Sequence, residues 1–384
     1  MQPTGELRGN AVHVGGDARQ RFYDSRGYGR PVSGNEIALS RVEAAHLLFR
    51  GDLSGVTLAG RDGPTVGFER FFVDSAATTE RFSVRYLVYS DLRDRGFYLS
   101  PTRDGWPGGD VDLGDGGDVD VGDAVDLIAY ERGSTPDTGN VLYPVRIVGE
   151  RESIAAADVA GSTLAIVDEE SDITYFAATT PDVEGSTTYG PPSDLAGVLL
   201  DDRVVIWDAP TDLYERGFYG QPLTGRAAAV EDVLQLSLVE AASLAARGSL
   251  SLSRIAGDAA ATADGNADAT DGDDTAAIRS RGLAVEGERF DRRLTVYERL
   301  RDRSTVPKTG FKFGADFRTY LDVETVEELP HSQHLVRVVE PDHVFAPREL
   351  SLDVRLAGGV RKEMVFALTD GDDVEWVSVG RLTP

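Results

Sequence analysis

The chain has 384 residues, of which 65 are acidic and 39 basic, so its formal charge at pH 7 is −26. This length favours two or more domains, and 41% apolar residues can build cores, which excludes a wholly disordered chain. The absence of cysteine excludes disulfides, thiolate nucleophiles and Cys-ligated zinc. No apolar run approaches the roughly 18 residues of a membrane span, and no signal-peptide core is present. We therefore expect a soluble cytoplasmic protein without a membrane partner.

The basic residues are almost all arginine. Only Lys308, Lys312 and Lys362 are lysines. Replacement of surface lysine by Asp and Glu is typical of a salt-filled cytoplasm, because dense carboxylates keep a protein soluble when salt screens charge repulsion. The composition therefore predicts a halophilic source. At high salt the repulsion between an acidic protein and nucleic acid is weak, so the net charge does not exclude an RNA partner.

The first predicted helix, in residues 39–53, recurs in residues 236–250. Ten of the fifteen aligned positions are identical, and both copies combine helical spacing of apolar residues with a glycine stop. Further along the chain, residues 80–95 match 288–303, and residues 143–148 match 335–339 more weakly. These pairs predict a tandem duplication with roughly 190 residues in each unit.

Strands and acid-rich segments lie between the predicted helices. Runs rich in Val, Ile and Trp, such as 203–207 and 375–379, are typical of strands. Residues 104–126 are dominated by Gly and Asp, and residues 256–277 contain only Ala, Asp, Gly, Thr and Asn. Neither acidic segment has the ligand spacing of an EF-hand, so we expect solvated insertions, the second of them disordered.

Together these features predict an α+β fold, built as a tandem duplication of a two-part module. The predicted domains are 1–78 and 79–190 in the first repeat, and 191–285 and 286–384 in the second.

The two copies differ in the residues that carry chemistry. All three lysines and three of the five histidines lie in the last 77 residues. His331 aligns with about Asn140, and Lys362 aligns near Ala160. The second copy is therefore the one equipped for chemistry, and the first is a scaffold derived from it.

Three segments of the second copy carry a family resemblance. Residues 308–320, which end in Tyr320, resemble the segment that opens the catalytic domain of archaeal tRNA-splicing endonucleases. Residues 331–338 resemble their His-Ser-x-x-Leu-Val segment, and residues 355–362 resemble their Arg-(x)₅-Arg-Lys segment. The duplication is similar to the class in which each chain joins an inactive and an active copy and two chains form the enzyme.

The resemblance implies a tRNA-intron lyase that cuts precursor tRNA at bulge-helix-bulge structures, as a homodimer and without a cofactor or metal. Tyr320 would be the base, His331 the acid and Lys362 the stabilising cation, and the products would be 2′,3′-cyclic phosphate and 5′-hydroxyl ends. Residues 286–384 would be the catalytic domain, a mixed β-sheet with flanking helices like that of restriction-type nucleases, and 79–190 its degenerate counterpart.

Independently of the resemblance, these residue types suit metal-free RNA cleavage. Attack by the 2′-hydroxyl needs a base, the 5′-oxygen needs an acid, and the phosphorane needs a cation. Histidine titrates near neutrality, and lysine is a compact charge. Tyrosine is a weak base unless a nearby cation lowers its pKa, a role open to Lys362.

Four further cations are candidates for RNA binding. In the resemblance, Arg355 and Arg381 correspond to arginines that sandwich a bulged base, and guanidinium planes stack on nucleobases. A solvated charge is the alternative for Arg381. Lys308 and Lys312 flank a glycine turn and either contact phosphates or cap a strand.

Other functions and sites stay open. The chain is alternatively a non-catalytic RNA-binding or structural subunit, or a metal-dependent hydrolase that uses His331, His334 and His343. No carboxylate has recognisable ligand spacing with these histidines, and His334 is expected to be structural. The acidic run 168–172 lies where the family has a loop that docks into a partner chain, and a solvated hairpin tip is the alternative.

Overall fold

The computed structural model describes residues 2–58, 63–103, 105–111, 125–134, 140–224, 232–253 and 271–384. The chain divides into two compact units. Unit 1 comprises Met1–Thr180, Val344–Leu352 and Val379–Pro384, and unit 2 comprises Pro181–His343 and Asp353–Ser378. Among the described residues, no helix has both the length and the apolar character that crossing a membrane requires.

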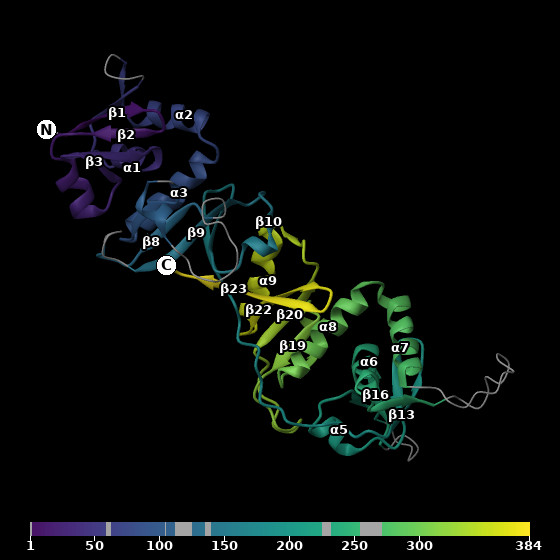
Figure 1. The fold of residues 1–384 in the computed structure, drawn as a ribbon. Helices are drawn as coiled ribbons and strands as arrows, with labels where there is room; N and C mark the ends of the chain where they lie inside the picture. Colours follow the sequence, from purple (N-terminus) through teal and green to yellow (C-terminus); the bar gives the residue numbers. More distant parts are fainter. Residues whose placement is uncertain are drawn as a thin grey trace. The chain divides into compact units, whose positions relative to one another are not determined.

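Unit 1 begins with a six-stranded sheet and two helices (Figure 1). Its elements are β1 (Thr4–Arg8), β2 (Ala11–Val14), η1 (Arg19–Asp24), β3 (Arg30–Ser33), β4 (Glu36–Ser40), α1 (Arg41–Phe49), β5 (Gly55–Thr57), β6 (Thr65–Val66) and α2 (Phe68–Thr78). The strand order is β3-β4-β2-β1-β5-β6, with β1 and β5 parallel and the other pairs antiparallel.

The second part of unit 1 is a mixed sheet packed against one long helix. Its elements are α3 (Phe82–Asp94), β7 (Tyr98–Pro101), η2 (Pro107–Asp110), β8 (Leu127–Tyr130), β9 (Val141–Gly149), β10 (Ile154–Ala155), η3 (Ala156–Asp158), β11 (Thr163–Val167) and β12 (Ile173–Thr179). The strand order is β12-β11-β9-β8-β7, and only β9 and β11 are parallel. Strand β10 pairs with β21 (Val344–Phe345), which the second repeat contributes to unit 1.

Unit 2 begins with a five-stranded sheet in the order β15-β16-β14-β13-β17. Its elements are β13 (Leu195–Leu199), β14 (Arg203–Ile206), α5 (Thr211–Glu215), β15 (Gln221–Pro222), β16 (Leu234–Ser237), α6 (Leu238–Ala246), β17 (Leu250–Leu252) and α7 (Asp271–Glu286). Helices α6 and α7 lie side by side, and α6 also contacts β16 (Figure 1).

The second repeat ends in a mixed sheet with the order β18-β19-β20-β22-β23. Its elements are α8 (Arg289–Asp302), β18 (Val306–Thr309), η5 (Phe311–Phe313), β19 (Phe317–Tyr320), β20 (His334–Val339), α9 (Pro347–Gly359), β22 (Glu363–Asp370) and β23 (Asp373–Leu382). β18, β19 and β20 are antiparallel neighbours, whereas β20 and β22 are parallel. Helix α8 packs against this sheet.

The two repeats fold alike, which confirms the α+β fold and the tandem duplication. The helices that the repeat pattern predicted are α1 and α6, and both begin with the same capping box. The Ser40 hydroxyl accepts the N–H of Glu43, and the Ser237 hydroxyl accepts that of Glu240, while each glutamate carboxylate accepts the backbone N–H of its serine. This reciprocal bonding satisfies free N–H groups at the start of each helix.

The first predicted insertion, 104–126, contains residues that belong to the fold. Residues 112–124 lie outside the described residues. Trp106 is 2% exposed, and the side chain of Asp126 is 6% exposed and ion-paired to two arginines. The prediction of a solvated segment is therefore wrong at these two positions.

The second predicted insertion, 256–277, includes residues that belong to a helix. Residues 254–270 lie outside the described residues, but α7 begins at Asp271. Its residue Asp274 accepts the backbone N–H of Leu252 in β17 at 2.9 Å. This contact gives the acidic start of α7 a fixed partner in the sheet, which composition alone did not predict.

Candidate active site

Strand register brings predicted catalytic residues to one end of the mixed sheet of unit 2. Thr319, His334 and Glu363 stand opposite one another on β19, β20 and β22. The next residues toward the sheet's end are Tyr320 at the end of β19 and Lys362 before β22. Because side chains alternate between the faces of a sheet, Tyr320 and Lys362 share the face opposite to that of Thr319.

Hydrogen bonds tie the segment of His331 to the same end of the sheet. The Lys362 ammonium donates to the carbonyl of Ser332, the residue after His331, at 2.9 Å. The N–H of Gln333 donates to the Thr319 carbonyl, also at 2.9 Å. His331 itself is exposed. The predicted base, acid and cation therefore come from segments that meet at this end, with the histidine open to a substrate.

Tyr320 is 3% exposed and packs in a small apolar cluster. Burial raises its pKa, and the positive charge of Arg318 opposes this rise only in part. The Arg318 guanidinium carbon lies 5.8 Å from the centre of the Tyr320 ring. The cation that acts on this tyrosine is therefore Arg318, whereas the sequence suggested Lys362.

Lys362 is half-buried, and its surroundings make its ammonium group easier to deprotonate. Burial lowers the pKa of Lys362 below its ordinary value of 10.5, and the charge of Arg318 lowers it further. The Lys362 nitrogen lies 5.7 Å from the centre of the Phe313 ring, in the η5 turn. The ammonium is thus held between the Ser332 carbonyl and an aromatic face.

The predicted RNA-binding cations occupy different surroundings. Lys312 is exposed in the η5 turn, next to Phe313. Arg355 is exposed on α9, the helix that precedes Lys362. Arg381 is exposed near the end of β23, in the segment that belongs to unit 1. Contacts of these three cations with RNA stay predictions.

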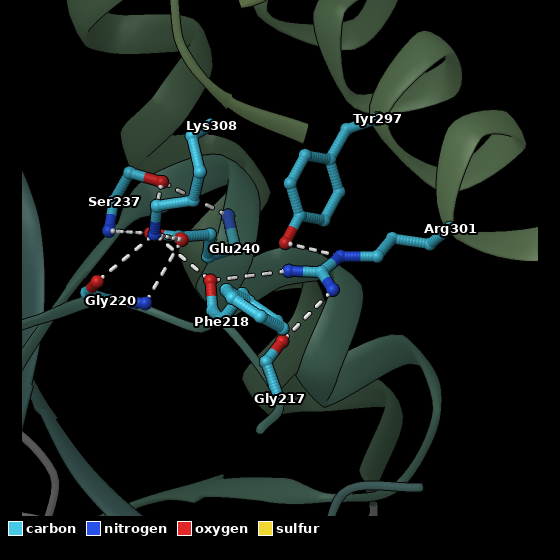
Figure 2. A network of polar contacts seen from close by, with 8 residues as sticks. All are labelled: Gly217, Phe218, Gly220, Ser237, Glu240, Tyr297, Arg301 and Lys308. Atoms are coloured by element: carbon cyan, nitrogen blue, oxygen red, sulfur yellow. Dashed lines mark hydrogen bonds and ion pairs between the residues drawn. The ribbon is translucent and has the colours of Figure 1, made fainter. Parts of the chain in front are cut away.

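Lys308 is half-buried, and its ammonium is bonded to other parts of unit 2 (Figure 2). Its ammonium donates to the carbonyls of Phe218 at 2.9 Å and Gly220 at 3.0 Å, and to Glu240 Oε1 at 3.2 Å. An ammonium has three hydrogens, so these bonds use all of them. Of the two roles open to Lys308, the structure favours the structural one, and we remove it from the RNA-binding set.

The same network holds the turn that precedes β15. Arg301 donates to the carbonyls of Gly217 at 3.0 Å and Phe218 at 3.4 Å, and to the Tyr297 hydroxyl at 3.1 Å (Figure 2). Glu240 accepts the N–H of Gly220 at 2.9 Å. Lys308 of β18 and Arg301 of α8 thereby link the mixed sheet and its helix to the five-stranded part of the same repeat, within unit 2.

Buried aspartates identify equivalent positions in the two repeats. Asp126 accepts the N–H of Ile147 at 2.8 Å, and Asp316 accepts that of Val338 at 2.9 Å. Each also pairs with two arginines at the start of the preceding long helix, where Arg81 is the residue directly before α3. Counting along the strands from these anchors equates Tyr320 with Tyr130.

The same registers equate the other two members of the predicted triad with the residues that the sequence comparison suggested. Extending the registers beyond the strand ends places His331 opposite about Asn140 and Lys362 near Ala160, although the pairing of β8 with β9 shifts between Ala129 and Tyr130. The first copy therefore keeps the tyrosine and lacks the histidine and the lysine.

His334 has a structural environment, as expected. It is 4% exposed, its Nδ1 lies 2.9 Å from the Thr319 hydroxyl, and burial lowers its pKa. Within the described parts of the chain, no three His, Asp or Glu side chains gather closely enough to hold a metal ion. The geometry thus gives no support to a histidine cluster at His331, His334 and His343.

Sequence reasoning missed Arg318, the cation nearest to Tyr320. It lies two residues before Tyr320 on β19, so both side chains share one face of the sheet. The signal that would have found it is the comparison of the repeats, because its counterpart in the first copy is the apolar Ile128.

Comparison with known proteins agrees with this arrangement. The family model "tRNA intron endonuclease, catalytic C-terminal domain" matches residues 290–376, and the model of the N-terminal domain matches twice, at 4–72 and 195–262. A tRNA-splicing endonuclease of Halobacterium salinarum is 53% identical over 382 residues, which cover 99% of each chain. One of Haloferax volcanii is 50% identical over 381 residues, and one of Methanococcoides burtonii is 34% identical over 392 residues, each covering at least 98% of both chains.

Proposed function

Because the chain belongs to the tRNA-splicing endonuclease family, we propose that it excises introns from precursor tRNA at bulge-helix-bulge structures. The observation that carries the proposal is the convergence of Tyr320, Lys362 and the segment of His331 at one end of the mixed sheet. RNA of this kind is recognised by shape and by splayed bases, for which the exposed cations Lys312, Arg355 and Arg381 are candidates.

The proposed reaction is a metal-independent transesterification. Tyr320 takes the proton of the 2′-hydroxyl as its oxygen bonds to the adjacent phosphorus. The bond from phosphorus to the 5′-oxygen breaks, and His331 gives that oxygen a proton. Lys362 stabilises the negative charge on the non-bridging oxygens. The products are a 2′,3′-cyclic phosphate and a 5′-hydroxyl.

The environment of Tyr320 has a consequence for pH dependence. Because burial raises its pKa, Tyr320 is neutral at rest near pH 7. The fraction of ionised tyrosine grows with pH, whereas the proposed acid His331 must keep its proton, so these two requirements oppose each other as the pH rises. The lowered pKa of Lys362 sets a further limit, since loss of its charge at alkaline pH removes the stabilising cation.

The proposed enzyme is a homodimer, because excision of an intron needs two cuts and each chain has one equipped copy. A twofold dimer supplies two sites related by symmetry. The turn between β11 and β12 is a candidate docking element. Asp168 accepts the N–H groups of Glu170 and Asp172 at 2.9 Å, which gives the exposed acidic turn a defined shape.

The test is incubation with an intron-containing precursor tRNA in molar KCl and EDTA, followed by analysis of the product ends. We expect two cuts that leave 2′,3′-cyclic phosphates. Substitutions Tyr320→Phe, His331→Ala and Lys362→Ala should each slow cleavage by about 10²- to 10⁴-fold. The matched control is Tyr130→Phe, the same change in the first copy, which should cleave like the parent. Cleavage that requires added metal and leaves 3′-hydroxyls would contradict the proposal.

A further inference from the structure

Arg318 is a partly buried cation to which the fold gives no counter-charge. Its Nε is buried without a hydrogen-bond partner. In the described part of the chain, no carboxylate forms an ion pair with its guanidinium. Removing a charge from water without pairing it costs free energy. Many other described arginines are paired with carboxylates, among them Arg279 with Asp291 and Arg289 with Asp316.

Lys308, the cation directly opposite Arg318 on β18, differs from Arg318 because it has a carboxylate partner. Lys308 and Arg318 are paired positions of the antiparallel strands β18 and β19. Lys308 is neutralised by Glu240 and by two carbonyls. Both cations line an open cavity of about 490 Å³, so the Arg318 side chain is reached from solvent. Arg318 is therefore reached from solvent and forms no ion pair within the described ranges, although the carboxylates of Asp202, Glu240 and Glu286 line the same cavity.

The position of Arg318 relates it to the proposed catalytic residues. It shares a sheet face with Tyr320, whose ring centre lies 5.8 Å from the guanidinium carbon. The registers of β19, β20 and β22 also place Arg318 on the face of the sheet that carries Lys362, and the positive charge of Arg318 lowers the pKa of Lys362. Two neighbouring cations without an acidic partner favour an anion between them.

The first copy shows that the sheet does not need a cation at the position of Arg318. The paired positions of Lys308 and Arg318 are occupied there by Ser100 and Ile128. Ile128 is fully buried, and the sheet forms without a cation at this point. The arginine is present in the copy that has the histidine and the lysine, and absent in the copy that lacks them.

We propose that Arg318 is a substrate-binding residue that holds the phosphate at the cleavage site together with Lys362. This inference rests on the proposed function of the same site. A guanidinium presents a planar fork of N–H groups that matches two phosphate oxygens, whereas an ammonium acts as a point charge. Arg318 fixes the orientation of the phosphate, and Lys362 stabilises the negative charge that develops on its oxygens.

The test compares Arg318→Met and Arg318→Lys with the parent enzyme in molar KCl. Cleavage of precursor tRNA is measured at saturating enzyme in a single turnover. Binding is measured over a range of KCl with the same RNA carrying a 2′-deoxy nucleotide at each cut. We expect Arg318→Met to cleave about 10- to 100-fold more slowly than the parent. The slope of log Kd against log salt concentration should become shallower by the amount that corresponds to about one phosphate contact. Arg318→Lys should recover part of both losses.

The matched control is Arg279→Met, which removes an exposed arginine of α7 that pairs with Asp291 at 2.7 Å. It should cleave and bind like the parent. Unfolding midpoints check the fold, and Arg318→Met should keep or raise the midpoint because it removes an unpaired charge. If Arg318→Met does not fold, Arg318→Ile, which copies the first repeat, replaces it.

A third readout follows the three lysines by NMR after selective labelling. Arg318→Met should move the titration of Lys362 to higher pH, which a purely structural role at a distance would not do. Parent-like cleavage and an unchanged salt slope in Arg318→Met would overturn the inference while the proposed function stands. A parent enzyme that neither binds nor cuts precursor tRNA would instead overturn the proposed function.

Discussion

At the residue scale, two equivalent glutamates are stabilised differently. Glu43 accepts the N–H groups of Gly29 and Ser40 at 2.7 Å, but burial outweighs these bonds and raises its pKa. Burial also acts on Glu240, but there the Lys308 charge and the backbone N–H groups together hold the pKa below its ordinary value. The second repeat therefore contains a buried ion pair, and its carboxylate depends on one lysine.

The expected effect of Lys308→Met is a loss of about 3–5 kcal/mol in the free energy of unfolding, because it leaves Glu240 buried and unpaired. A carboxylate with a depressed pKa stabilises the fold above its unfolded pKa and loses that contribution as pH falls through its folded pKa. The loss should therefore be largest near pH 7 and shrink as acid protonates Glu240. Denaturant unfolding in molar KCl at several pH values measures it.

Two variants control this prediction. Lys312→Met removes an exposed lysine and should change stability by less than about 0.5 kcal/mol. Lys308→Met combined with Glu240→Gln removes both charges and should be more stable than Lys308→Met alone. A single Lys308→Met variant that unfolds like the parent at pH 7 would show that the pair does not support the fold.

How far single residues were predictable depends on how rare they are. Tyr320, His331 and Lys362 were found because lysine and histidine are scarce here and because the motifs occur in family order. Arg318 was overlooked, although comparison of the repeats sets it against the apolar Ile128 of the first copy. Its special property is the absence of a partner, which only three-dimensional structure reveals. The structural role of Lys308 likewise depends on carbonyls about 90 residues earlier in the chain.

At the element scale, one buried carboxylate fixes the start of the strand that carries Tyr320. Asp316 directly precedes β19 and accepts the N–H of Val338 in β20 at 2.9 Å. It also pairs with Arg289 at 2.6 Å and Arg293 at 3.1 Å, both from α8. This single side chain therefore joins α8, β19 and β20.

Asp316→Asn should lower the free energy of unfolding by about 2–4 kcal/mol, because the buried carboxylate loses its ion pairs with Arg289 and Arg293, although Arg293 keeps Glu286. Asp291→Asn is the matched control. It removes the same charge from an exposed pair with Arg279, so its effect should stay below about 1 kcal/mol. Both are measured by denaturant unfolding in the same salt. Equal effects of the two substitutions would contradict the anchoring role.

Elements were predictable where local pattern decides them. The paired helices α1 and α6 follow from repeated apolar spacing and capping serines. The beginning of α7 was missed because its first residues have the composition of a solvated segment, and a contact from Asp274 to β17 holds them in place. Asp126 was assigned to an insertion for the same reason, although tertiary ion pairs bury it.

At the scale of the whole molecule, the asymmetry between the copies predicts the behaviour of mixed dimers. In the proposed homodimer, pairing one parent chain with one Lys362→Ala chain leaves a single active site. We expect such dimers to make one cut and to accumulate the RNA in which one exon is still joined to the intron. Differently tagged chains allow the mixed dimer to be isolated, and gel analysis measures the products. Two full-rate cuts by the mixed dimer would contradict one active site per chain.

Unit 1 is completed by residues from the far end of the sequence. Strand β21 pairs with β10, Leu382 packs against the core of unit 1, and Arg95 Nη1 lies 3.5 Å from the Pro384 carbonyl. A chain emerging from the ribosome must therefore extend about 160 residues beyond Thr180 before β21 is made, which takes roughly 10–30 s at usual rates.

Throughout that interval β10 has no partner, and an open strand edge favours aggregation. The order of synthesis thus gives the early chain a vulnerable period, during which its many carboxylates are the main protection. If the two repeats were made as separate chains, the first chain would lack β21 and the last residues of the sequence until the second chain bound to it.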